Sequence, residues 1–432
     1  MSLPASVDVA IVGAGTAGAA AALLCARRGL RVLAIDRAPL ERAGAHWINA
    51  VPTRLFDEAG IGRPIAPELE SPPVAMHMLA GRGPVRATSS GQDLLEVDMA
   101  HLVARLQREA REAGAILEGG VRALGVDHHV GGAAQLRTDR GAVRADAIVD
   151  ASGLAGARLL GDLRTPRSDL CAAAQEVRVL RDRGEAERFF ASLGVPLGDV
   201  VVMAGLAGGY SILNVRVARD RVFLLSGTIP GEGHPSGQQL IDGFCAERRW
   251  IGELVHGGAR AIPLGRPADV LARDRVALLG DSARQVFSAH GSGIGAGLVA
   301  ARVLADELAG GRGVHGYGVR WQRAHGGLLA GYDVFRRFSQ RLSIDDLARM
   351  IEAGLVDART MTPAMEQRAP ELSVGALLPK ARRALREPRL LSGIAGVGAR
   401  MVALEALYRA YPARVGSRRA WVRAVERVAS IG

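Results

Sequence analysis

The sequence predicts a mixed α/β fold with two sheets and a helical C-terminal region. Three observations carry this prediction. Strand, turn and helix patterns accompany two glycine-rich stretches that lie far apart, near Gly13 and near Gly291. Apolar and polar residues alternate between Cys171 and Pro230, as is typical of strands in a half-buried sheet. Beyond Trp321, apolar residues recur at helical spacing.

The first glycine-rich stretch follows a continuous apolar run, Val9–Val12, which predicts a strand covered on both faces. The glycines then fall at GxGxxG spacing, which allows a tight turn, close approach of a diphosphate and close helix packing. The N-terminus of the next helix offers free N–H groups and positive charge to an anion. A second strand ends in Asp36, which can accept hydrogen bonds from a ribose diol. These elements predict a dinucleotide site without separating FAD from NAD; its candidate residues are Gly13, Gly15, Thr16, Ala17, Gly18, Asp36 and Arg37.

The second glycine-rich stretch, "GDSARQVFSAHGSGIGAG", repeats this order, with a predicted strand at 276–279 and a helix that begins near the glycines. A second helix N-terminus suits the other end of a large cofactor. In FAD, Asp281 would hold a ribityl hydroxyl, and amides near Gly293–Gly295 would face the ring edge that becomes anionic on reduction. We interpret the two stretches as the two ends of one cofactor site. The candidates here are Gly280, Asp281, Gly291, Gly293, Ile294 and Gly295.

A third stretch, "ADAIVDASG", lies between the other two in the sequence. It predicts a strand at 145–149 that leads to Asp150 and Gly153, where small residues would let a cofactor lie close to the chain.

These three stretches, in this order, resemble the FAD-dependent oxidoreductases that include aromatic-ring hydroxylases and, more closely, geranylgeranyl reductases. The resemblance covers roughly residues 5 to 310. It implies a Rossmann-type FAD-binding domain interleaved with a β-sheet substrate domain, with Val121 near the adenine. We expect the FAD-binding domain at 1–70, 95–160 and 271–310, the substrate domain at 71–94 and 161–270, and C-terminal helices at 311–432.

Several positions depart from the pattern of the resembled family. Met99 stands where an arginine usually anchors the cofactor, Ser288 replaces a proline beside the flavin, and Arg284 replaces a small residue or histidine. The stretch "YSILNV" keeps only Tyr210 of a Tyr-x-Trp-x-Phe-Pro pattern. We therefore expect a reshaped cavity for an apolar substrate of isoprenoid or polyketide type. A role in secondary metabolism would fit such a substrate.

Two reactions remain open at this point. One is double-bond reduction or dehydrogenation by hydride transfer through flavin N5, with NAD(P)H as a transient electron donor. The other is hydroxylation by oxygen activation at flavin C4a. A flavoprotein without enzymatic activity is a third interpretation.

Four residues are candidates for catalysis. His46 and Trp47 lie in the loop after the second strand, His290 directly precedes Gly291, and Tyr210 is expected on a strand of the substrate domain. Each could donate a proton or line the substrate cavity. A purely structural role is the alternative for each of them, and we assign no metal site.

The formal net charge of +11 does not indicate a nucleic-acid-binding protein. From Arg320 onward there are 20 basic and 10 acidic residues, which leaves 35 and 34 in the rest of the chain. The excess therefore lies in the C-terminal region, where helices are expected at 332–342, 344–355, 376–387 and 398–411. Such basic helices could form a lid, rest on an anionic membrane or bind a carrier protein. The N-terminus does not resemble a signal peptide and the three cysteines are scattered, so we expect a cytoplasmic protein, with peripheral membrane contact as an alternative.

Overall fold

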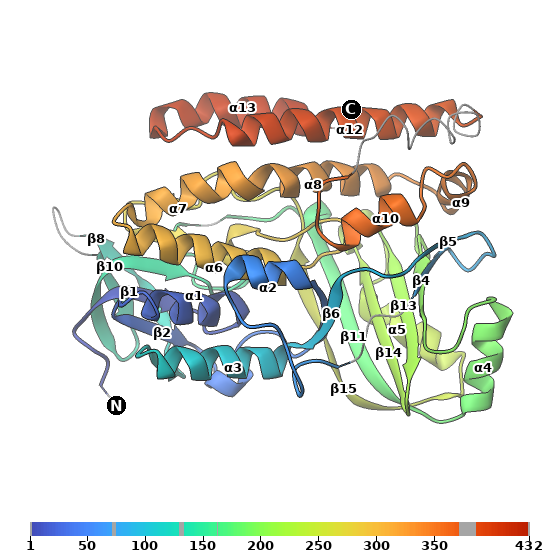
Figure 1. Ribbon diagram of the computed structural model, residues 1–432, viewed down its shortest axis with the longest axis horizontal. Helices are drawn as coiled ribbons and strands as arrows, with labels where there is room; N and C mark the ends of the chain where they lie inside the picture. Colours follow the sequence, from blue (N-terminus) through green and yellow to red (C-terminus); the bar gives the residue numbers. More distant parts are fainter. Residues whose placement is uncertain (1, 71–74, 129–133, 162, 371–385, 431–432) are drawn as a thin grey trace.

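The computed structural model of the protein describes residues 2–70, 75–128, 134–161, 163–370 and 386–430. Two large sheets lie side by side in Figure 1, and the C-terminal helices form layers above them. The mixed α/β fold predicted from the sequence is confirmed.

The first sheet is built on buried parallel strands. β1 pairs in parallel with β2 and β10, β2 pairs with β7, and β10 pairs with β17. β16 adds an antiparallel edge, and β8 and β9 form an antiparallel pair beside β10. The strands are β1 (Ser6–Val12), β2 (Val32–Asp36), β7 (Ile116–Gly119), β8 (Ala123–His128), β9 (Ala134–Thr138), β10 (Gly141–Asp150), β16 (Ala272–Arg273) and β17 (Val276–Leu278).

Three helices pack on the first sheet: α1 (Thr16–Ala26), α3 (Met99–Glu112) and α6 (Ile294–Ala309). Every residue of α1 from Gly18 to Ala26 is buried, as expected of an alanine-rich helix enclosed on all sides. α1 packs against both α3 and α6. Helices from three distant parts of the sequence therefore share one core.

The second sheet has seven strands in the order β15-β11-β14-β13-β12-β4-β5. All its pairs are antiparallel except β4 with β12. Its strands are β4 (Met76–Ala80), β5 (Arg86–Ser89), β11 (Leu170–Leu180), β12 (Val200–Ala204), β13 (Ile212–Ala218), β14 (Arg221–Thr228) and β15 (Ile251–Pro263). Residues of α4 (Arg183–Ser192) and α5 (Gly237–Ala246) share its apolar core. The strands of both sheets lie within the predicted ranges, although the domain bounds themselves stay predictions.

β3 (Ile48–Pro52) and β6 (Leu94–Asp98) form an antiparallel two-stranded ribbon outside the two large sheets. α2 (Thr53–Ala59) follows β3 and packs against α6. Short helical turns complete the loops: η1 (Leu40–Arg42), η2 (Arg167–Asp169), η3 (Pro230–Glu232) and η4 (Gly280–Ala283).

The C-terminal region is helical, as predicted. The predicted helix at 376–387 lies almost wholly outside the described residues. The others appear among α7 (Gly313–Trp321), η5 (Gln322–Gly326), α8 (Gly327–Ser339), α9 (Ile344–Glu352), α10 (Ala358–Met365), α12 (Pro388–Arg409), η6 (Val415–Ser417) and α13 (Arg418–Ala429).

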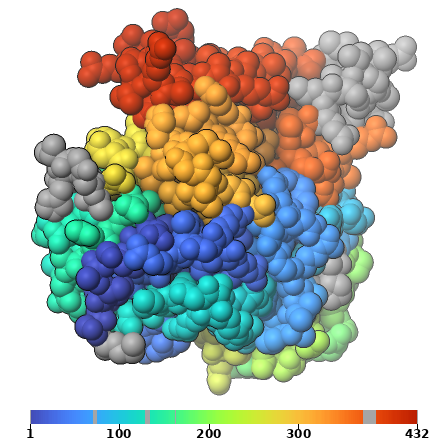
Figure 2. Space-filling model, turned by 60° about the vertical axis from the view of Figure 1, so that its left-hand side comes forward, coloured from blue at the N-terminus to red at the C-terminus, as the bar shows by residue number. Residues whose placement is uncertain are grey.

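α12 and α13 form the outermost layer, drawn in red in Figures 1 and 2. α12 packs against α8 through buried Val397, Leu404 and Tyr408. Of the helices in the described part of the chain, it alone is long and apolar enough to cross a membrane by length and composition. An 18-residue window of α12 has a mean hydropathy of 1.5, and only 17% of that window is buried.

Candidate functional site

The first glycine turn joins β1 to α1 at the carboxyl edge of the first sheet. Gly13 has a φ of +104°, and a Cβ at this position would lie 2.4 Å from the carbonyl oxygen of Ala151. A Cβ on Gly18 would lie 1.8 Å from the carbonyl oxygen of Gly13. Neither position can hold a side chain. The first-turn amides of α1, at Thr16, Ala17 and Gly18, are left without helical partners and can bind an anion.

Asp36, at the end of β2, lies beside this turn. Its carboxylate accepts hydrogen bonds from the N–H groups of Ala14 and Ala38, both at 2.9 Å. A carboxylate has further lone pairs, so Asp36 can also accept bonds from a ribose. Val121 is buried and donates its N–H to the carbonyl of Asp36 at 2.8 Å, while Arg37 is exposed.

The two glycine-rich stretches are in contact. A Cβ on Gly280 or on Gly297 would lie 3.1 or 3.2 Å from the Cβ of Ala17, in the first turn of α1. α6 begins at Ile294 with Gly293 as its N-cap, and a Cβ on Gly293 would lie 3.0 Å from a carboxylate oxygen of Asp281. The N-termini of α1 and α6 therefore lie close together, although their sequences are far apart.

A crevice at this junction is lined by polar groups. Its lining includes Asp150, Gly153, Thr165, Asp281, Ser282 and Arg284. Asp281 is reached by solvent from within the crevice, but protein atoms surround its carboxylate on the other sides. The resulting desolvation raises the pKa of Asp281, and the positive charge of Arg260 acts in the opposite direction. The Oγ1 atom of Thr165, the Nε of Arg284 and the Oγ of Ser292 are buried without a hydrogen-bond partner. Unpaired polar atoms of this kind fit a site for a polar, phosphate-bearing cofactor.

Asp150 and Gly153 have different roles in this crevice. Asp150 is fully buried, and its carboxylate accepts hydrogen bonds from the N–H groups of Ser152 (3.1 Å) and Leu159 (2.9 Å) and from the Ser152 hydroxyl. Asp150 thus fixes the loop. Gly153 has a φ of +79° and no heavy atom within 4 Å of a Cβ built on it, so the space above it is open.

Gly295 is required for packing. A Cβ on Gly295 would lie 2.2 Å from Cδ1 of Leu55 on α2, and Ile294 beside it packs against the core of the first domain. At the start of α6, the groups that these two residues can offer to a cofactor are their backbone amides.

Gln285 and Tyr317 form a support that local sequence patterns do not reveal. The Gln285 side chain accepts from the Gly280 N–H (2.7 Å) and donates to the Tyr317 hydroxyl (2.8 Å), which donates to the Leu278 carbonyl (2.9 Å). All of these groups are buried. They hold the loop that carries Asp281.

An apolar wall lies next to Gly291. Trp47 is buried against Cys171, Ala173 and Val286, and Tyr210 and Ile262 pack on this cluster. A Cβ on Gly291 would lie 3.8 Å from the Tyr210 hydroxyl and 3.6 Å from Ile262.

Tyr210 itself differs from its predicted position, because it lies in the turn before β13 and not on a strand. The reason is that Gly208 and Gly209, with φ of +89° and +49°, turn the chain there. Burial raises the pKa of Tyr210 well above its usual value, so the hydroxyl stays protonated.

The two histidine candidates have different surroundings. The His290 ring stacks on Phe287 with centroids 4.9 Å apart, and its Nε2 is buried without a partner. Burial lowers the pKa of His290 to about 4, so the ring is neutral at pH 7. His46 is exposed on its loop, whereas the neighbouring Trp47 is buried.

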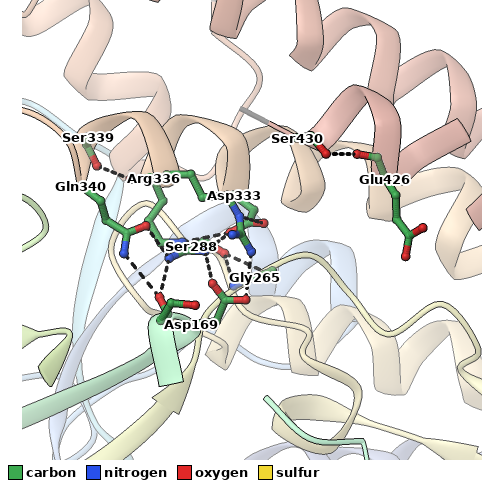
Figure 3. Close-up of polar contacts among 11 residues, drawn as sticks. Asp169, Gly265, Ser288, Asp333, Arg336, Ser339, Gln340, Glu426 and Ser430 are labelled. Carbon is green, nitrogen blue, oxygen red and sulfur yellow. Dashed lines mark hydrogen bonds and ion pairs between the residues drawn. The ribbon is translucent and has the colours of Figure 1, made fainter. Parts of the chain in front are cut away.

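A buried ion cluster ties α8 to this site (Figure 3). The Arg336 guanidinium is fully buried and pairs with Asp169 (2.8 Å) and with Asp333. Arg337 pairs with the same two carboxylates at 2.9 and 3.0 Å. The backbone of Gly265 is hydrogen-bonded to the Ser288 hydroxyl in the glycine loop, and the preceding residue, Leu264, donates to the Asp169 carbonyl. The sequence predicts α8 but not these pairs.

Met99, where the resembled family has an arginine, is fully buried at the start of α3 and offers no charge to the crevice. A larger depression of about 960 Å³ lies at the opposite edge of the first sheet, beside Asp8, Asp146 and Arg275. Parallel α/β sheets bind ligands at their carboxyl edge, and the glycine loops lie there. We therefore place the site at the crevice.

Comparison with known proteins agrees with this geometry. Residues 6–188 match the FAD binding domain family. The chain is 26% identical over 449 residues to the digeranylgeranylglycerophospholipid reductase of Sulfolobus acidocaldarius, covering 98% of this chain and 97% of that protein.

Solved structures share the fold. A geranylgeranyl bacteriochlorophyll reductase-like protein from Thermoplasma acidophilum matches with a TM-score of 0.70 at 18% identity, covering 91% of this chain and 99% of that chain. The anhydrotetracycline hydroxylase OxyS from Streptomyces rimosus matches with a TM-score of 0.59 at 18% identity, covering 84% and 76%. The chain thus carries an FAD-binding domain and is an FAD-dependent oxidoreductase, distantly related to the digeranylgeranylglycerophospholipid reductases.

Proposed function

We propose that this protein reduces carbon–carbon double bonds of an isoprenoid, lipid-like substrate. The observation that carries the proposal is the apolar cluster of Trp47, Val286 and Ile262 beside Gly291, on which Tyr210 packs with its hydroxyl near Gly291. An isoprenoid chain offers no hydrogen-bonding groups, so an apolar wall is the surface that would bind it. The distant similarity to a digeranylgeranylglycerophospholipid reductase along nearly the whole chain supports the same substrate class.

The residues at the site suit such a reduction. Bound FAD, once reduced, supplies a hydride, and saturation of the double bond then requires one proton on the other carbon. Tyr210 would donate that proton, because its hydroxyl lies beside Gly291 and carries its proton at neutral pH. His290 is neutral and packed on Phe287, so we assign it to shaping the loop. Trp47 would line the substrate cavity.

The test separates reduction from hydroxylation. Protein reduced without oxygen is mixed with a geranylgeranyl glycerophospholipid, and flavin absorbance and product mass are followed. Reduction predicts flavin reoxidation without oxygen and two added hydrogens for each saturated bond. A product that forms only with oxygen and carries one added oxygen atom would instead establish a hydroxylase. Tyr210→Phe should slow anaerobic reoxidation by about a hundredfold and leave FAD binding unchanged.

We also propose that the protein works at the cytoplasmic surface of a membrane, where such a substrate resides. The outward side of α12 carries Ala395, Ala399, Val402 and Ala406, and Val402 is 59% exposed. The neighbouring helix α13 carries exposed arginines: Arg419, Arg423 and Arg427. An apolar strip together with arginines on an adjacent helix suits an anionic bilayer. A second copy of the chain fits less well, since pairing through this face would bring like charges together.

A further inference from the structure

β15 places an arginine of the second sheet beside the first glycine turn. β15 pairs antiparallel with β11, so that Arg260 lies opposite Ala173 and Ile262 lies opposite Cys171. Directly opposed residues share a face of the sheet. Cys171 and Ala173 pack against Trp47, so Arg260 and Ile262 lie on the face of the sheet that meets the first domain.

One end of the Arg260 side chain reaches the first glycine turn. Its Nη2 donates to the Gly44 carbonyl at 2.7 Å. A Cβ on Gly15 would lie 3.0 Å from the Cα of Gly44, so this loop and the GxGxxG turn are in close contact. The guanidinium thus bonds Gly44, and Gly44 directly contacts the turn that is expected to approach a diphosphate.

The same side chain also lies near the second glycine stretch. Its positive charge lowers the pKa of the Asp281 carboxyl, against the larger effect of burial. Two residues further along β15, Ile262 lies beside Gly291. The strand therefore passes both glycine-rich stretches, with Ile262 beside Gly291 and Arg260 near the first turn.

The negative charge at the site favours a cation beside the first glycine turn. Asp36 and Asp281 both lie at the site, and the diphosphate of FAD adds further negative charge. Two arginines, Arg158 and Arg284, line the crevice. The Arg284 guanidinium donates to the Arg164 carbonyl at 2.7 Å, and burial lowers its pKa. Arg37 is directed to the Ala155 carbonyl, at 3.5 Å. Arg260 is exposed, and the group that its Nη2 bonds is a neutral carbonyl.

We infer that Arg260 binds the diphosphate of FAD, so that the second sheet supplies a cation to a cofactor site built mainly by the first. Arginine is suited to this role, because its planar guanidinium bonds phosphate oxygens in pairs and keeps its charge. The inference rests on the FAD site and not on the proposed reaction. It also implies that cofactor binding fastens the two sheets together.

The test measures the binding of FAD, ADP and riboflavin to protein freed of cofactor, by calorimetry. Arg260→Gln should weaken FAD and ADP alike, by about ten- to a hundredfold, and leave riboflavin unchanged, because only the first two carry the diphosphate. Arg260→Lys should keep most of the affinity. Arg221→Gln is the matched control, since Arg221 lies on the second sheet and pairs with Asp220.

Two results would overturn the inference. One is an Arg260→Gln protein with unchanged affinity for both FAD and ADP. The other is a loss of FAD affinity with ADP binding intact, which would place the guanidinium on the ribityl chain or the ring. Thermal unfolding of the cofactor-free variants shows whether the fold is kept. All these measurements are made without turnover, so they stand whether or not the proposed reduction is found.

Discussion

A single methyl group at Gly18 has no room in this fold. In Gly18→Ala it would lie 1.8 Å from the Gly13 carbonyl oxygen, so α1 would have to move away from the turn. We expect the variant to purify without FAD. Fluorescence titration should show at least a hundredfold weaker FAD binding, which corresponds to about 3 kcal/mol, a modest cost for such a clash. Gly243→Ala, with no heavy atom within 4 Å of the new methyl group, is the control and should bind FAD normally.

The neutral His290 ring makes stability depend on pH in a defined direction. The pKa of His290 is about 4 in the folded protein and has its ordinary value of 6.5 in the unfolded chain. Below pH 6.5 the unfolded chain therefore binds a proton that the folded chain does not, and the folded state loses stability until about pH 4. We expect the melting temperature of the wild type to fall more steeply between pH 6.5 and 4 than that of His290→Phe. Parallel curves for the two proteins would argue against a neutral buried ring.

At the scale of elements, α8 depends on charge balance. Arg336→Met leaves Asp169 and Asp333 buried with only the partly exposed Arg337 between them. Removing one partner of a buried ion pair typically costs about 3–5 kcal/mol, so we expect a loss of that order in urea unfolding. Arg337→Met removes an outer partner and should cost clearly less. Equal losses for the two variants would contradict a special role of Arg336.

The sequence predicts these elements unequally well. The GxGxxG turn and the start of α6 are predictable, because strand, turn and helix follow one another within a few residues. Gln285 bonds Tyr317 across 32 positions, and Arg336 pairs with Asp169 across 167. No local pattern encodes such pairs. Arg260 is hidden for a similar reason, since its face is known only from the register of β15 against β11.

At the scale of the whole molecule, the candidate cofactor site draws on residues that lie far apart in the sequence. Gly15, Asp281 and Arg260 come from the first strand–turn–helix unit, from the loop after β17 and from the second sheet. The sequence supports the idea of a single cofactor site through the two glycine-rich stretches. Their direct contact, through Ala17 against Gly280 and Gly297, comes from the packing of α1 on α6. Packing of this kind depends on the folded shape of both helices.

The outer layer of α12 and α13 leads to a prediction for the whole molecule, tested by flotation with vesicles. The wild type should float with vesicles containing phosphatidylglycerol and much less with phosphatidylcholine alone. Replacing Arg419 and Arg423 by glutamine should lower partitioning about thirtyfold, since each arginine near an anionic surface contributes about 1 kcal/mol.

Val402→Glu places a charge in the apolar strip and should also reduce flotation, whereas Leu254→Glu, at an exposed position on β15, should not. Truncation before α8 is unsuitable here, because it would leave Asp169 without Arg336 and Arg337. If all variants float equally, this layer is not the membrane contact. If instead Val402→Glu converts a dimer to a monomer in light scattering, the strip binds a second copy of the chain, because a buried glutamate would disrupt such a contact.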